Sequence, residues 1–165
     1  MAAGSTYTPI ATTTSTGVTT ITMSSIPSTY TDFILVIKGQ ISGNVFYKIN
    51  GDTGSNFSQT ALFGDGTSAS SARESNRSDG IYLGTNIGAP MNSTGAMAII
   101  HFINYANSTT YKTSLYKMDN ASAGTQAGVG LWRSTSAINQ VSVTSSNANG
   151  IASGTTFTLY GIAAA

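Results

Sequence analysis

The stretch that decides the fold is Asp-Phe-Ile-Leu-Val-Ile-Lys-Gly, residues 32–39. Its centre, Phe33–Ile37, consists of aromatic, β-branched and aliphatic side chains, which favour strands. Successive side chains of a strand point to opposite faces, so an apolar run on both parities predicts a strand that is covered on both faces. Such cover comes either from a central position in a packed sheet or from a partner subunit.

Similar apolar runs, each bounded by Gly, Asn, Asp or Ser, recur about every 10 to 15 residues, and this spacing is typical of β-sandwiches and barrels. Weak alternation over Val18–Ser24 places that strand at a sheet edge or on a surface. The predicted strands are Tyr7–Thr12, Val18–Ser24, Asp32–Gly39, Val45–Asn50, Ser58–Phe63, Gly80–Gly84, Ala96–Tyr105, Tyr111–Met118, Ala127–Arg133, Gln140–Thr144 and Thr156–Ile162. The chain is therefore expected to be all-β.

A chain of 165 residues fits one domain. Residues 1–17, rich in Thr and Ser, are expected to form an N-terminal arm or a first edge strand, and residues 18–165 a single β-sandwich domain. The segment Gly64–Gly80 lacks apolar periodicity and is predicted to be one exposed loop. The pair Asn50-Gly51 predicts a tight turn.

Charge is scarce in this chain: only 8% of residues are charged, and the formal net charge is +1. Nucleic acids and anionic membranes are recognised through Lys and Arg clusters, and the seven basic residues form no cluster, so neither partner is expected. No apolar run approaches the ~20 residues that span a bilayer. A nearly neutral surface suits a protein that is docked in an assembly.

Catalytic groups are few and dispersed, which predicts a protein that is not an enzyme and uses no cofactor or metal. The single histidine, His101, lies in an apolar strand and is expected to be packed or hydrogen-bonded within the sheet. The six acids fall mostly in predicted turns, where carboxylates shape turn geometry. They are Asp32, Asp52, Asp65, Glu74, Asp79 and Asp119.

Aromatic residues supply the candidate interface. Tyr105, Tyr111 and Tyr116 fall in one predicted hairpin around the turn at residues 106–110, and Trp132 lies beside Arg133 in a Gly-flanked strand. Tyr and Trp dominate protein interfaces and also stack on sugars. Packing in a core or an interface is the preferred interpretation of Trp132, and carbohydrate binding is the alternative.

Three stretches resemble a family of small structural proteins of tailed bacteriophages, including cyanophages. Residues 25–33, Ser-Ile-Pro-Ser-Thr-Tyr-Thr-Asp-Phe, are similar to the family's segment before a central strand. Residues 50–58, Asn-Gly-Asp-Thr-Gly-Ser-Asn-Phe-Ser, resemble its Asn- and Asp-rich segment. Residues 154–162, which contain Leu-Tyr-Gly-Ile, are similar to its closing strand. The family often has an Arg after the central strand, where this chain has Gly39-Gln40.

The resemblance implies a jelly-roll-like antiparallel β-sandwich on the virion surface. It implies a capsid decoration (cement) protein that binds the major capsid protein and copies of itself, as a dimer or trimer, and stabilises the head shell. The alternative is a tail- or head-fibre module that binds a host receptor or carbohydrate through Trp132 and the tyrosine hairpin.

Overall fold

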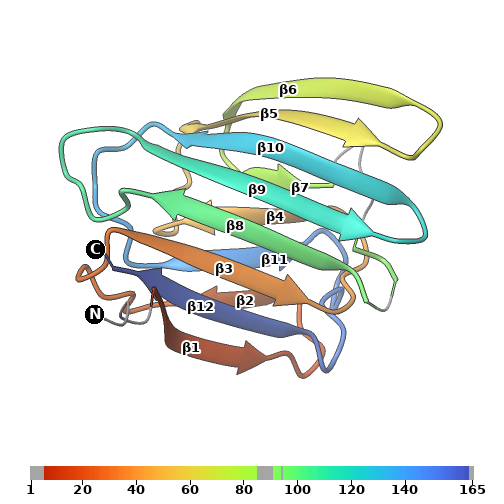
Figure 1. Ribbon diagram of the computed structural model, residues 1–165, viewed down its shortest axis with the longest axis horizontal. Coiled ribbons are helices and arrows are strands. Elements are labelled where there is room, and N and C mark those ends of the chain that lie inside the picture. Colours follow the sequence, from red (N-terminus) through yellow and green to blue (C-terminus); the bar gives the residue numbers. More distant parts are fainter. Residues whose placement is uncertain (1–5, 85–90, 94, 164–165) are drawn as a thin grey trace, which may run out of the picture.

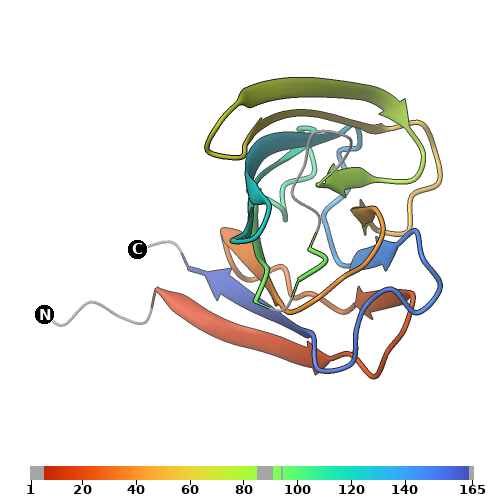
Figure 2. The same cartoon turned by 90° about the vertical axis from the view of Figure 1, so that its right-hand side faces the viewer.

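The computed structural model describes residues 6–84, 91–93 and 95–163. These residues form twelve strands, arranged as two antiparallel sheets that face each other across one core (Figure 1 and Figure 2). None of them belongs to a helix that is long and apolar enough to cross a membrane. The prediction of an all-β, antiparallel β-sandwich is confirmed.

The larger sheet has eight strands in the order β1-β12-β3-β8-β9-β10-β5-β6. Every neighbouring pair in it is antiparallel. Across the sheet from one edge to the other, the strands are β1 Tyr7–Thr14, β12 Thr156–Ile162, β3 Asp32–Lys38, β8 Met97–Ile103, β9 Lys112–Asn120, β10 Gly124–Trp132, β5 Phe57–Gly64 and β6 Ala69–Arg77.

The smaller sheet has four strands in the order β2-β11-β4-β7, and it lies behind the larger sheet in Figure 1. Its strands are β2 Thr20–Met23, β11 Val141–Ser145, β4 Val45–Ile49 and β7 Ile81–Leu83. β2 and β7, at its edges, are short. A short edge strand offers few free backbone groups to another chain.

The strand order has the nesting of a jelly roll. Without the hairpins β5-β6 and β9-β10, the remaining eight strands form two sheets of four, β1-β12-β3-β8 and β2-β11-β4-β7. The first strand pairs with the last and the second with the one before the last, as in the paired Greek keys of jelly rolls. The two hairpins are insertions that widen one sheet, so the outer surface of that sheet is unusually broad.

The core lies between the sheets and contains a cluster of aromatic rings. Phe33 of β3 and Phe102 of β8 stack with centroids 4.4 Å apart, and Phe102 meets Tyr47 of β4 edge-on at 5.6 Å. The Tyr47 hydroxyl lies 2.6 Å from the Ser114 hydroxyl of β9. These contacts join the two sheets. Burial raises the pKa of the Tyr47 phenol well above its ordinary value, which keeps the group neutral.

β3 occupies the central position that its sequence predicts, but the chain covers it on one face only. Phe33, Leu35 and Ile37 point into the core and are fully buried. Ile34 and Val36 point to the other side of the sheet and are only partly buried. Among the described residues, no second layer covers that side. A partner subunit is the other source of cover that the sequence allows for this face.

The prediction of one exposed loop over Gly64–Gly80 is wrong, because Ala69–Arg77 form β6. This strand pairs with β5 at the sheet edge, where its backbone hydrogen bonds need no apolar side chains. Apart from Ala69 and Ala72, one on each parity, its residues are polar, so the strand gives no alternation signal. The charges expected in a loop, Arg73, Glu74 and Arg77, instead line an edge strand, where charge discourages pairing with other chains.

The N-terminal segment takes the second of its two predicted forms. Residues 7–14 form β1, an edge strand that pairs with β12 along its length, and residues 1–5 lie outside the described residues. The predicted edge strand over Val18–Ser24 corresponds to β2, which is an edge of the smaller sheet. The turn at Asn50-Gly51 is also present, with φ of 50° and 63°.

The stretches that carry the family resemblance contact each other or the core. The first stretch, residues 25–33, contacts the third, residues 154–162. The Tyr30 ring lies directly against Gly161, and the Thr31 N–H donates to the Ile162 carbonyl over 2.9 Å. A Cβ at Gly161 would come within 2.4 Å of that ring. In the second, Asp52 hydrogen-bonds the Trp132 indole. The three stretches are therefore fold determinants in this chain.

Candidate functional site

Three of the four predicted interface residues belong to the core. Tyr105, Tyr116 and Trp132 are buried, and only Tyr111 is exposed, at 57%. Tyr105 packs edge-on against Phe33, and its hydroxyl donates to the Pro27 carbonyl. Tyr105, Tyr116 and Trp132 therefore offer no surface to a partner, because aromatic content alone does not reveal which side of a strand faces the second sheet. For Trp132, the core packing that the sequence allows is confirmed.

Trp132 has a structural hydrogen-bonding partner. Its Nε1–H donates to Asp52 Oδ2 over 2.6 Å, and its ring lies parallel to Phe57 with centroids 6.5 Å apart. Asp52 also accepts from Asn56 Nδ2 at 2.9 Å and from the Gly54 N–H at 2.7 Å. Burial alone would raise the pKa of Asp52, but these hydrogen bonds and the charge of Lys48 lower it.

Replacing Asp52 by asparagine is expected to lower the free energy of unfolding at pH 7 by about 1–3 kcal/mol, since a charged acceptor of three hydrogen bonds is lost. Because the pKa of Asp52 is lower in the folded state, its stabilisation is full above the unfolded value of about 3.9 and is lost as the pH falls through the folded value. The difference between Asp52→Asn and the wild type should therefore shrink between pH 7 and pH ~2.

Urea unfolding followed by the fluorescence of Trp132, the only tryptophan, measures this difference. Asp119→Asn is the control, since Asp119 lies at the surface beside Lys117 and surface ion pairs contribute at most ~1 kcal/mol. Equal stability losses for the two variants at pH 7 would contradict the role assigned to Asp52.

Two further titratable groups, His101 and Asp32, are engaged in contacts that hold a strand and a loop. His101 Nε2 lies 2.9 Å from Asp32 Oδ2, while Asp32 Oδ1 accepts the Asn104 N–H over 2.7 Å. The expectation that His101 is hydrogen-bonded within the sheet is confirmed. Within the described ranges, no three His, Cys, Asp or Glu side chains gather in a way that could hold a metal ion.

The feature that stands out is the surface of the eight-stranded sheet that is turned away from the four-stranded sheet, here called the outer face; it faces the viewer in Figure 1. Strand register aligns its side chains in rows across the sheet. One row runs through Tyr160, Ile34, His101, Leu115, Val129 and Thr60. The next runs through Thr158, Val36, Ile99, Lys117, Ala127 and Leu62. Most of these side chains are apolar.

The apolar side chains form two patches. The β3 patch is a shallow hollow lined by Tyr7, Ile34, Val36, Ile99 and Tyr160. The β10 patch comprises Leu62, Leu115, Ala127 and Val129, which line a second hollow. Leu62, Leu115 and Val129 are 64%, 47% and 46% exposed, and they are the exposed large aliphatic side chains among the residues that the structure describes.

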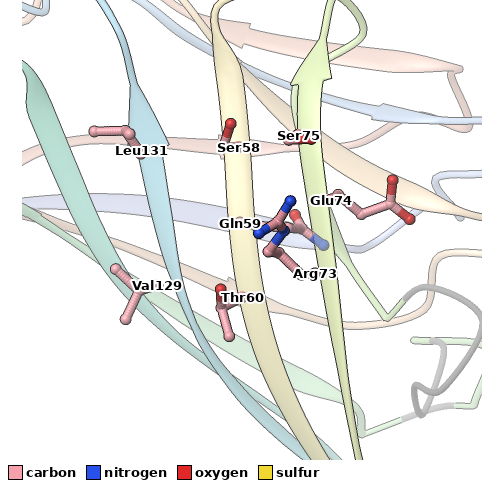
Figure 3. A pocket seen from close by; sticks show the side chains of 8 residues that line it. All are labelled: Ser58, Gln59, Thr60, Arg73, Glu74, Ser75, Val129 and Leu131. Atoms are coloured by element: carbon pink, nitrogen blue, oxygen red, sulfur yellow. The ribbon is translucent and has the colours of Figure 1, made fainter.

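Polar groups separate the two patches, and each is paired within the chain. His101 of β8 bonds Asp32, and Lys117 of β9 lies 3.0 Å from Asp119. A third hollow extends the face to β6, where Arg73 lies opposite Thr60 of β5. Figure 3 shows Val129 and Leu131 on the neighbouring β10, whereas the Glu74 side chain extends away from them on the other side of β6. The outer face thus has two apolar patches, a central strip with the paired groups His101 and Lys117, and a charged margin at Arg73. Apolar patches with a polar rim are typical of protein-binding surfaces.

Sequence reasoning missed the β10 patch, although a signal for it exists. Leu115 and Val129 lie on the parity opposite to the buried Tyr116, Gln126 and Trp132 of the same strands. An apolar residue on the parity that should meet solvent marks a surface that is covered by something else.

Comparison with known proteins gives no identification: no family model matches the chain, and no curated protein matches it. The resemblance to phage structural proteins is therefore untested by these comparisons.

Proposed function

We propose that the protein is a non-enzymatic structural protein of a tailed bacteriophage virion, and specifically a capsid decoration protein that binds the head shell and stabilises it. The observation that carries this proposal is the broad, uncovered outer face, on which two apolar patches flank a central strip of paired polar groups. Soluble monomers rarely expose contiguous apolar surfaces of more than a few hundred Å², and larger ones usually mark binding sites for proteins or membranes.

The state of the titratable groups supports a role without catalysis. Asp52 holds Trp132, Asp65 holds its own hairpin loop, and His101 is paired with Asp32. Four hydrogen bonds from Thr67 and Ser68 lower the pKa of Asp65, which identifies it as a turn-forming carboxylate. Groups that are engaged in such contacts serve the fold rather than proton transfer.

The alternative function, a fibre module that binds a receptor or carbohydrate, loses its principal support. It depends on Trp132 and the tyrosine hairpin as an exposed stacking surface, and Trp132, Tyr105 and Tyr116 are buried. Tyr111 is the member of that set that remains exposed. The decoration role needs none of these residues.

The test is to incubate the purified protein with head shells of the phage that encodes it, prepared without this chain, and to sediment the shells. We expect binding that saturates at a fixed number of copies per equivalent shell site, because a closed shell repeats each site by symmetry. The temperature at which the shells disassemble should rise, since a ligand that binds only the intact state stabilises it.

Cryo-electron microscopy of the virion is the second measurement, and it should place the chain over the major capsid protein. Failure to co-sediment at saturating concentration, or density confined to the tail and its fibres, would refute the decoration role.

A further inference from the structure

We infer that the outer face is covered by the outer face of a second copy, so that two sandwiches pack back to back in a dimer with twofold symmetry. This inference rests on the proposed function in taking the outer face as an assembly surface: a second copy covers that face, and the dimer binds the head shell through its remaining surface. Its first support is β3, in which Ile34 and Val36 continue the apolar character of the buried Phe33, Leu35 and Ile37 onto the uncovered side.

The arrangement of the two patches fits a twofold axis. The boundary between β8 and β9 divides the eight-stranded sheet into four strands on each side, with the β3 patch on one side and the β10 patch on the other. A twofold axis that runs parallel to the strands at this boundary places β3 of one copy opposite β10 of the other. Ile34 then faces Val129 of the second copy, because both lie in the same row.

The same axis makes the contact self-complementary. The β3 patch of each copy meets the β10 patch of the other copy, so the dimer contains two equivalent contacts, as in other isologous interfaces. Sheets that pack face to face lie ~10 Å apart with their strands rotated by roughly 30°. The rows therefore cross at a moderate angle, and the contact between the patches is centred on Ile34, Val36, Ala127 and Val129.

The size of the face suits a stable dimer. Strand spacing of ~4.8 Å across eight strands, and strands of ~7 residues at ~3.3 Å each, give an area of roughly 800 Å². A standard protein–protein interface takes ~800 Å² from each partner.

The charge of the face favours a second copy over a highly charged partner. Lys117 is paired with Asp119, and His101 with Asp32, so the centre of the face carries little net charge. Two such faces do not repel each other, whereas a strongly acidic or basic partner would find no complementary charge there. Arg73 lies toward the margin, where charges remain hydrated.

The sheet edges are less suited to self-association. β6 carries Arg77, which pairs with Glu74 and Asp79 and lies over the Tyr82 ring of β7, so this side of the sandwich is closed by charges. β1 contains Pro9 and an irregularity in its pairing next to it. Both features oppose the addition of another strand.

The experiment uses the isolated protein and measures its mass in solution by sedimentation equilibrium. We expect twice the chain mass of 16.9 kDa for the wild type at micromolar concentration. Val129→Glu and Ile34→Lys each place an unpaired charge against an apolar patch of the second copy and should raise the dissociation constant by roughly 100-fold or more. Thr22→Glu, which adds the same charge on an exposed position of β2, is the control and should remain dimeric.

Mixing the two variants provides the decisive measurement. An equimolar mixture of Val129→Glu and Ile34→Lys should form heterodimers, because the new carboxylate of one variant then lies opposite the new ammonium group of the other. Unchanged Trp132 fluorescence establishes that both variants are folded.

A wild-type protein that remains monomeric at ~100 µM would refute the inference. Its dimer dissociation constant would then be ~1 mM or higher, which is too weak for a specific dimer. A dimer that persists in both single variants would also refute it, and a mixture that stays monomeric would exclude the proposed axis. Because no shell is present, each of these results leaves the shell-binding test of the proposed function unaffected.

Discussion

Replacing Phe102 by alanine is expected to lower the free energy of unfolding by about 3–5 kcal/mol, the usual cost of removing a buried phenylalanine. Phe102 is fully buried and contacts rings from both sheets, with Phe33 at 4.4 Å and Tyr47 at 5.6 Å. Alanine would leave a cavity at the point where the two sheets meet. Aromatic pairs contribute ~0.5–1.5 kcal/mol beyond the area that they bury, so the loss should lie toward the upper end.

Urea unfolding monitored by Trp132 fluorescence measures this change, and calorimetry should show a fall in Tm of roughly 6–20 °C. Leu115→Ala is the matched control, because Leu115 comes from the neighbouring strand β9 but is 47% exposed on the outer face. In the monomeric protein, we expect that control to change stability by less than ~1 kcal/mol. A loss below ~1 kcal/mol for Phe102→Ala would show that the aromatic cluster does not hold the sheets together.

The fold could be predicted from the sequence to a large extent, because most strands coincide with short apolar or β-branched runs bounded by turn residues. Each predicted strand overlaps an observed one, and the closing strand Thr156–Ile162 has the predicted bounds. β6 was not predicted, because most of its residues on both parities are polar. Its backbone hydrogen bonds to β5 hold it in the sheet, and these bonds produce no pattern among the side chains.

The order of the strands could be predicted only through the family resemblance. The pairing of β1 with β12, and of β2 with β11, joins residues from opposite ends of the chain. Local patterns carry no information about such distant partners. The contact of Tyr30 with Gly161 shows how such distant strands are matched: two short stretches, far apart in sequence, are complementary in shape.

The candidate site was largely beyond sequence reasoning for a related reason. Parity tells which residues share a face of a strand, but not which face meets the second sheet. Tyr116 and Leu115 are adjacent in sequence, and the first is buried while the second is exposed. Sequence composition favours the aromatic residue as an interface residue, whereas the aliphatic one lies on the uncovered face. The exception is β3, where apolar residues on both parities indicated a second covering surface in advance.

Replacing Gly80 by alanine is expected to destabilise the protein by on the order of 3 kcal/mol, through both backbone strain and a direct clash. Gly80 precedes β7 with φ of +115°, a conformation that L side chains rarely adopt. An added Cβ would lie 2.3 Å from the Tyr47 carbonyl oxygen and 3.0 Å from its carbon. Both atoms belong to the backbone of β4, so they cannot move aside without disturbing the pairing of β4 with β7.

Gly154→Ala separates the two contributions. Gly154 has φ of +86°, also in the region that favours glycine, but a Cβ there would meet no atom within 4 Å. That variant should lose only the conformational contribution, about 1–2 kcal/mol, and the difference between the variants measures the clash with β4. Equal losses for Gly80→Ala and Gly154→Ala would mean that β4 and β7 can separate at little cost. β7 would then be a loosely held edge rather than a part of the core of the sandwich.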